Sequence, residues 1–133
     1  MKWIHLCFQG QFVTQTCFQG RFGEETGSDQ FGGHILIHAP KKNNQIATAR
    51  LSNVELTYVG QAFRLGRYPI HFHLNGNQSN SYVMCCAIHK SFNRAVNIHG
   101  SHYILVKNNV AYNIMGGAMF LEDGIEIGKS VKD

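Results

Sequence analysis

The clearest pattern in the chain is an alternation of apolar and imidazole side chains from Ile70 to Leu74. Apolar residues occupy Ile70, Phe72 and Leu74, and His71 and His73 stand between them. A period of two predicts a β-strand with one face in a core. We expect the two imidazoles on the opposite face, about 7 Å apart, where they can share a metal ion, a substrate or a water network.

Two further segments, 34–38 and 51–59, are rich in aliphatic residues and are expected to form strands. Along the second, Val54, Leu56 and Tyr58 fall on one face. The polar, glycine-rich stretches between the strands predict loops. The 14 glycines against two prolines fit an all-β domain with many tight turns.

Three segments of the chain resemble one another: 53–63, 86–96 and 109–119. Each has a small or β-branched residue at its second position, Gly or Asn at the eighth, Ala at the tenth and an apolar residue at the eleventh. Repeats of about 20–25 residues in a strand-rich chain are typical of a β-solenoid, in which each copy is one coil. A β-sandwich also has short strands, but it does not require side chains to recur in register, so we favour the solenoid.

Placing the repeats in register brings chemically active side chains together. His99 is expected to lie on Glu122, and Asp123 follows directly. His71 and His73 come just beyond the equivalent position of the first copy. Because adjacent coils lie about 4.8 Å apart, we expect three histidines and two carboxylates on one side of the solenoid.

This cluster has two interpretations. Neutral imidazole is a common metal ligand and titrates near neutral pH, so the histidines can form a metal or acid/base site. Alternatively, they form a stacked polar ladder that satisfies turn backbone. Neighbours on a strand face opposite ways, so we expect Glu122 to face the histidines and Asp123 to cap the turn at Gly124. A single inward carboxylate fits a bound divalent cation, calcium or zinc, at least as well as a glycosidase, which usually uses two.

Other candidate residues are less constrained. Arg64 and Arg67 flank the organising strand and can grip the carboxylate of an acidic sugar, or they are solvated residues at a coil corner. The remaining histidines are not brought beside other imidazoles and carboxylates in this register and are expected at surface or satisfied core positions: His5, His34, His38, His89 and His102.

The charge pattern and the cysteines narrow the class of protein. The net charge of +4 comes from scattered residues, with Lys41-Lys42 the only basic doublet, which argues against nucleic-acid binding. No signal peptide is recognised, and no run approaches the roughly 18 apolar residues of a membrane span. The four cysteines contain no Cys-x-x-Cys pair, which argues against a zinc ribbon. Asn77-Gln78-Ser79 is an N-glycosylation sequon, and it favours a secreted setting.

The length of 133 residues suits one domain. Residues 7–12 are nearly repeated at 17–22, either by a small duplication or because the first residues are spurious. Residues 1–16 are therefore left unassigned, and residues 17–133 are expected to form the solenoid domain.

Several motifs resemble a known family. Residues 31–35, 66–73, 98–100 and 120–126 are similar, in the same order, to the right-handed parallel β-helix of fibrocystin-L-like receptors. The CEMIP-type cell-surface hyaluronidases share this region. The resemblance covers about residues 17–126. It implies an incomplete piece of an extracellular β-helix, without membrane contact of its own, in a large single-pass receptor. Open sheet edges would make such a piece prone to aggregation.

The hyaluronidase branch of this family bears on mechanism. Its paired histidines, His-Gly and Glu-Asp-Gly fall here on His71, His73, His99, Gly100, Glu122, Asp123 and Gly124. It typically has His-Cys where this chain has Gly117-Ala118, and Cys where this chain has Ala95. The missing imidazole argues against hyaluronan cleavage and favours a receptor.

We therefore expect binding or adhesion at the cell surface, with a glycosaminoglycan or other carbohydrate as ligand and Arg64, Arg67 and Asp123 as contacts. A hyaluronan-depolymerising hydrolase is the first alternative, and a structural spacer of a cell-surface coat is the second. The hydrolase would use His71, His73, His99 and Glu122 as catalytic residues.

Overall fold

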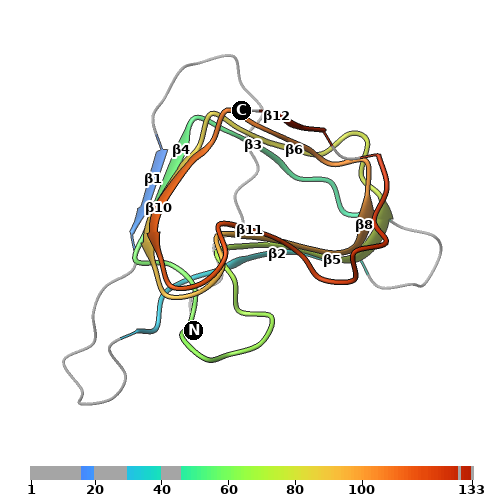
Figure 1. Cartoon of the computed structure of the whole chain (residues 1–133). Coiled ribbons are helices and arrows are strands. Elements are labelled where there is room, and N and C mark those ends of the chain that lie inside the picture. Colours follow the sequence, from blue (N-terminus) through green and yellow to red (C-terminus); the bar gives the residue numbers. More distant parts are fainter. Residues whose placement is uncertain (1–15, 20–29, 40–45, 129, 133) are drawn as a thin grey trace.

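The computed structural model describes residues 16–19, 30–39, 46–128 and 130–132 (Figure 1). Apart from Thr16, the unassigned segment 1–16 lies outside the described residues. So do the basic doublet at 41–42 and most of the near-repeat at 7–12 and 17–22.

Strands are the regular elements of the described residues, and no helix occurs among them. In chain order they are β1 (Thr16–Gln19), β2 (Ile35–Ile37), β3 (Arg50–Ser52), β4 (Val54–Thr57), β5 (Ile70–Asn77), β6 (Tyr82–Met84), β7 (Ala87–Ser91), β8 (Val96–His102), β9 (Leu105–Lys107), β10 (Val110–Ile114), β11 (Met119–Leu121) and β12 (Ser130–Lys132).

The strands form three parallel sheets that the chain visits in turn. The orders are β1-β4-β7-β10, β2-β5-β8-β11 and β3-β6-β9-β12, called below the β1, β2 and β3 sheets. Each strand pairs with the strand three places further along the chain, so the path is a coil with three sides (Figure 1). The all-β, parallel and coiled arrangement confirms the solenoid prediction. It is consistent with a parallel β-helix.

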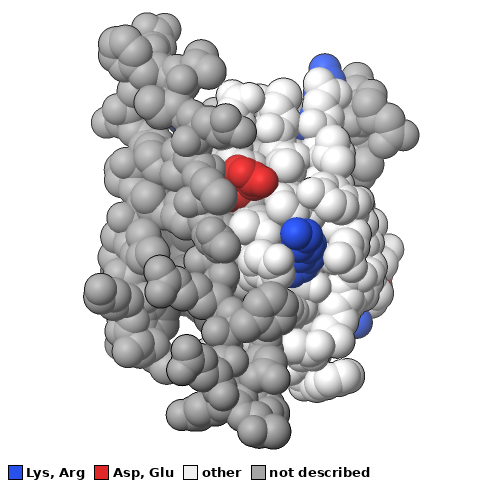
Figure 2. All heavy atoms as spheres, turned by 90° about the vertical axis from the view of Figure 1, so that its left-hand side faces the viewer, with Lys and Arg blue, Asp and Glu red and all other residues white. Residues whose placement is uncertain are grey.

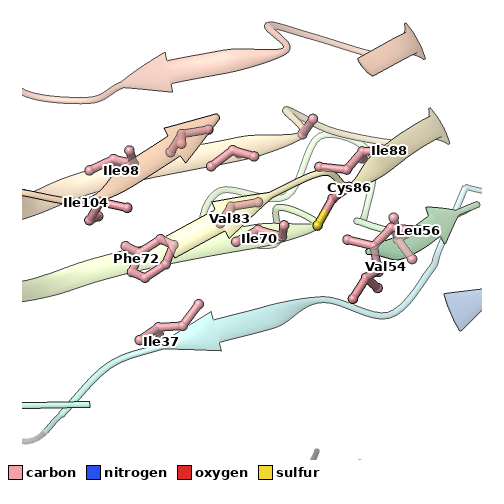
Figure 3. Packing of buried hydrophobic residues seen from close by; sticks show 14 residues of the cluster. Ile37, Val54, Leu56, Ile70, Phe72, Val83, Cys86, Ile88, Ile98 and Ile104 are labelled. Carbon is pink, nitrogen blue, oxygen red and sulfur yellow. The ribbon is translucent and has the colours of Figure 1, made fainter. Parts of the chain in front are cut away.

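The core lies between the three sheets, where inward side chains of successive coils pack together (Figure 3). Ile70 and Phe72 of β5 are fully buried there, as their alternation with histidine predicts. Ile98 of β8 pairs in register with Phe72 and points the same way. The buried cluster comprises Ile37, Val54, Leu56, Val59, Ile70, Phe72, Val83, Cys86, Ile88, Ala95, Val96, Ile98, Ile104 and Val106.

Single residues with a left-handed backbone make the corner between the β3 and β1 sheets. Asn53, Cys85 and Asn108 occupy this corner in consecutive coils, with φ of 56°, 52° and 55°. Asparagine adopts this conformation more readily than most residues. The corner at Asn53 divides the predicted strand 51–59 into β3 and β4. The prediction of one strand was therefore wrong. Of its supposed inward face, Val54 and Leu56 are buried, whereas Tyr58 is only half-buried and bends away with φ of 53°.

The predicted register is correct for the later coils and wrong for the first. Val110 pairs with Ala87, as the repeat predicts. In the coil before, however, Glu55 rather than Val54 pairs with Ala87. A loop at 60–69, drawn in green below the coil in Figure 1, then separates β4 from β5. Because local similarity cannot show where an insertion falls, the repeat aligned Phe63 with Val96, whereas Ile70 is the residue that pairs with Val96.

The alternation of β5 stops at His73. Leu74, predicted to face the core, is 41% exposed and has a φ of 45°. The pairing with β8 shifts register between His73 and Gly76, so the chain turns the next side chain, Asn75, inward. Asn75 replaces the missing apolar contact with hydrogen bonds, since its amide donates to the carbonyl of Ala47 and accepts from the Ala47 N–H at 3.1 Å.

Charged side chains are sparse on the described part of the face formed by the β1 sheet (Figure 2). Basic residues do not gather there, which agrees with the scattered charge of the sequence. No helix capable of crossing a membrane occurs in the described ranges.

Candidate functional site

The outer face of the β2 sheet carries two rows of side chains that run across the coils. In the first row, parallel pairing places Leu36, His71, Asn97 and Phe120 beside one another. The second row is one outward position further along each strand and contains His38, His73, His99 and Glu122. The pairing of His73 with His99 sets its register. Residues far apart in sequence therefore meet on one face because each coil repeats the same strand.

His71, His73 and His99 form a compact imidazole cluster. One ring nitrogen from each lies within 4.8 Å of the other two. The ring centroid of His73 lies 5.0 Å from that of His71 and 4.9 Å from that of His99. The Nδ1 atoms of His73 and His99 are 3.1 Å apart. The structure therefore brings these three side chains together, as the sequence predicts. Among the described residues, they form a group of donors that could hold a metal ion.

The hydrogen bonds of His71 define its tautomer. Nδ1 lies 3.1 Å from the carbonyl of Gly66, which can only accept, so Nδ1 carries the proton and donates. Nε2 is buried and has no hydrogen-bond partner. The pKa of His71 is lowered to about 4, chiefly by burial; the imidazoles of His73 and His99 also lower it, whereas the hydrogen bond to Gly66 and the charge of Glu122 oppose the shift. The ring is therefore neutral at pH 7 and presents an unused lone pair.

Two carboxylates lie beside His99. Glu122 Oε2 is 3.7 Å from Nδ1, and Asp123 Oδ2 is 3.3 Å from Nε2. The prediction that only Glu122 faces the histidines was wrong. Strand β11 ends at Leu121, so the alternation that should send Asp123 away no longer applies. Both carboxylates therefore lie beside His99, at one end of the histidine row.

Arg94 is a member of the site that the sequence analysis missed. Its guanidinium lies 3.5 Å from the ring centre of Phe120 and donates to Tyr68 Oη and Asn97 Oδ1, each at 3.3 Å. Asn97 in turn donates to Glu122 Oε2 at 2.9 Å. No motif marks Arg94, because it lies in the connection before β8 and reaches the site only through this packing.

The prediction that His38 lies apart from the histidine cluster was wrong. Its ring centroid lies 5.4 Å from that of His73, and its Nδ1 donates to the His73 carbonyl at 2.9 Å. A signal for it was present, because each inward apolar residue is followed by histidine in Ile37-His38, Phe72-His73 and Ile98-His99.

Three other histidines also have partners that the sequence did not indicate. His89 contacts Glu55 at 2.8 Å and stacks on Tyr112, on the β1 sheet. His34 Nε2 lies 3.4 Å from Arg67, and burial followed by this positive charge lowers the pKa of His34. His102 accepts a hydrogen bond from the Ile127 N–H. His5 lies outside the described residues.

The remaining predicted site residues, Arg64, Arg67 and Asn77, are all exposed. Arg64 is exposed on the 60–69 loop and stacks on Phe31, 5.0 Å from the ring centre. Arg67 is exposed beside His34. Asn77, the sequon residue, is exposed at the end of β5. In the part of the chain that the structure describes, no carboxylate pairs with either arginine or with Arg94.

Comparison with known proteins identifies the family. The family model described as the CEMIP β-helix matches residues 30–133. The chain belongs to this CEMIP β-helix family. It is 59% identical to mouse and human fibrocystin-L over 120 residues, which is 90% of this chain and 3% of each relative. It is 36% identical to human cell surface hyaluronidase CEMIP2 over 129 residues, covering 92% of this chain and 9% of that protein.

The chain thus spans only a small part of the length of these relatives. The likeness to fibrocystin-L confirms the resemblance predicted from the motifs, with the hyaluronidases more distant. No solved structure matches the chain significantly.

Protonation of the cluster is expected to destabilise the fold. The pKa of His71 is about 4 in the folded protein against 6.5 ordinarily, and burial also lowers that of His73. The unfolded chain therefore binds protons first, and the free energy of unfolding decreases as pH falls from 6.5 towards 4. His71→Asn keeps a donor for Gly66 but cannot titrate, so its profile should be flatter. Urea unfolding with chelator at pH 7, 5.5 and 4.5 measures this, and an unchanged slope would contradict it.

Proposed function

We propose that the CEMIP β-helix chain is a piece of the extracellular β-helix of a fibrocystin-L-like receptor and binds an acidic carbohydrate with the outer face of its β2 sheet. The observation that carries the proposal is the ordered guanidinium of Arg94, packed on Phe120 beside Asn97 and the histidine row. We expect the coil to be right-handed, as parallel crossovers almost always are.

The chemistry of this face suits a glycosaminoglycan. Guanidinium groups bind carboxylates in a two-point geometry, and Arg94 is already ordered by Phe120 and Tyr68, which reduces the entropic cost of binding. Arg64 and Arg67 extend the positive charge along the neighbouring loop. Aromatic and imidazole rings add flat surfaces for sugar contacts.

The names of two relatives agree with this ligand class. A mouse protein named cell migration-inducing and hyaluronan-binding protein is 41% identical over 105 residues, 74% of this chain. The name of human cell surface hyaluronidase CEMIP2 also points to hyaluronan and to the cell surface, which supports the proposal. The exposed Asn77 sequon is consistent with such a location and is proposed as a glycosylation site.

Loss of the Arg94 charge is expected to weaken glycan binding by about 10-fold or more, because hydrogen bonds to charged groups contribute roughly 1.5–3 kcal/mol. Hyaluronan oligosaccharides and a glycan array would be tested with the chain and Arg94→Gln. Lys90→Gln is the matched control, since it removes the same charge from an exposed position on the β1 sheet. Equal weakening in both variants, or no binding to any acidic glycan, would reject the proposal.

Hyaluronan depolymerisation is a second candidate, favoured by the contact of His99 with both carboxylates. Catalysis would use His71, His73, His99 and Glu122. The chain would be incubated with high-molecular-weight hyaluronan, with and without calcium. Hyaluronan that stays full length in both conditions removes this candidate. If neither cleavage nor binding occurs, a structural spacer in a cell-surface coat is the function that remains.

A further inference from the structure

We infer that His71, His73 and His99 form a binding site for a divalent transition-metal ion of the zinc class. The inference is independent of carbohydrate binding, because it rests on the donor atoms of the three imidazoles and the groups that hold the rings. Four observations carry it: the spacing of the nitrogens, the unused lone pair of His71, the groups behind the rings and the kind of donor.

The spacing is close to what a small ion requires. Zinc–nitrogen distances of about 2.0–2.1 Å place tetrahedral ligands roughly 3.3 Å from one another. The Nδ1 atoms of His73 and His99 are already 3.1 Å apart. The largest separation in the cluster is within 4.8 Å, so modest rotation of the rings completes the site.

His71 supplies the clearest sign that a ligand is missing. Its Nε2 atom is buried without a hydrogen-bond partner, and a buried polar atom left unsatisfied costs roughly 1–3 kcal/mol. The other nitrogen donates to the carbonyl of Gly66, so Nε2 has a lone pair and no proton. A bound cation would satisfy this atom directly.

The outer nitrogens of two rings are held as metal-binding proteins hold them. Imidazole ligands usually donate their second N–H to a backbone carbonyl or a carboxylate, which sets the tautomer and the ring orientation. Gly66 supplies the carbonyl behind His71. Asp123 Oδ2 lies 3.3 Å from Nε2 of His99, which leaves Nδ1 of that ring towards His73.

The kind of donor atom selects the class of ion. Three nitrogens suit zinc, cobalt, nickel or copper, whereas calcium takes six to eight oxygens. Glu122, with Oε2 at 3.7 Å from His99 Nδ1, can supply a fourth ligand.

The test uses Co²⁺ and Zn²⁺ with two variants that each remove one donor and keep the outer hydrogen bond. His71→Asn retains the N–H at the Nδ1 position for Gly66, and His99→Gln retains the N–H at the Nε2 position for Asp123. The wild-type chain is expected to bind one Co²⁺, with a visible absorption spectrum that Zn²⁺ abolishes. Each variant should lower Zn²⁺ affinity about 100-fold, and Asp123→Asn should lower it about 10-fold by loss of the positioning carboxylate.

Controls separate this site from the other metal-binding groups of the chain. His89→Gln, on the β1 sheet, and Cys85→Ser, at an exposed free thiol, should retain wild-type affinity. Circular dichroism of each variant checks folding. Unchanged Zn²⁺ affinity in both His71→Asn and His99→Gln would overturn the inference, as would Ca²⁺ binding at this cluster in preference to Zn²⁺. Metal binding without glycan binding would reject the proposed function only.

Discussion

Phe72→Ala is expected to lower the free energy of unfolding by about 4 kcal/mol, because it empties the volume of a fully buried ring. The ring packs between coils, with Ile37 and Ile98 as its register partners on either side. The backbones of the neighbouring strands β2 and β8 cannot move into the cavity without breaking their hydrogen bonds to β5. The loss is a large part of the roughly 5–15 kcal/mol that stabilises a typical domain. Urea unfolding followed by circular dichroism measures it.

The same substitution at Phe63 is the matched control. Phe63 is 95% exposed on the 60–69 loop, so Phe63→Ala should change the free energy of unfolding by less than about 0.5 kcal/mol. A similar loss in both variants would mean that burial between the coils is not what stabilises the fold.

Gly32→Ala is expected to destabilise the protein by about 3 kcal/mol through overlap with backbone. A Cβ atom at this buried position would collide with the carbonyl oxygen of Tyr58 and lie 2.7 Å from Val59 Cα. The 32–33 segment is also tied to the loop, because the Gly32 N–H donates to Gly60 at 2.7 Å. Backbone atoms cannot rotate away as a side chain would, so the packing of Gly32 against the backbone of Tyr58 and Val59 must break.

Gly33→Ala tests this explanation at the next residue. A Cβ atom there meets nothing within 4 Å, and we expect a change of less than about 0.5 kcal/mol. Thermal unfolding of the two variants side by side decides the matter. Equal stability of Gly32→Ala and the wild type would contradict the close approach to Tyr58.

The histidine cluster shows how far sequence reasoning reaches in a solenoid. His71 and His73 were predicted on one outer face from alternation alone, and His99 was placed beside Glu122 by the repeat; the structure has both arrangements. Such predictions succeed because a strand has a strict period of two and a coil returns the chain to the same sheet. The orientation of Asp123 was predicted wrongly, because strand β11 ends at Leu121 and the period of two does not extend to Asp123.

The sequence by itself determined that the chain is all-β, that its strands coil in repeats, and that imidazoles gather on one wall. Only the tertiary structure decided where the 60–69 insertion falls, which residue of the first coil lies on Ala87, and that Arg94 and His38 join the site. The physical reason is that periodicity is a local property of strands, whereas the length of a loop and the reach of a long side chain depend on packing between coils.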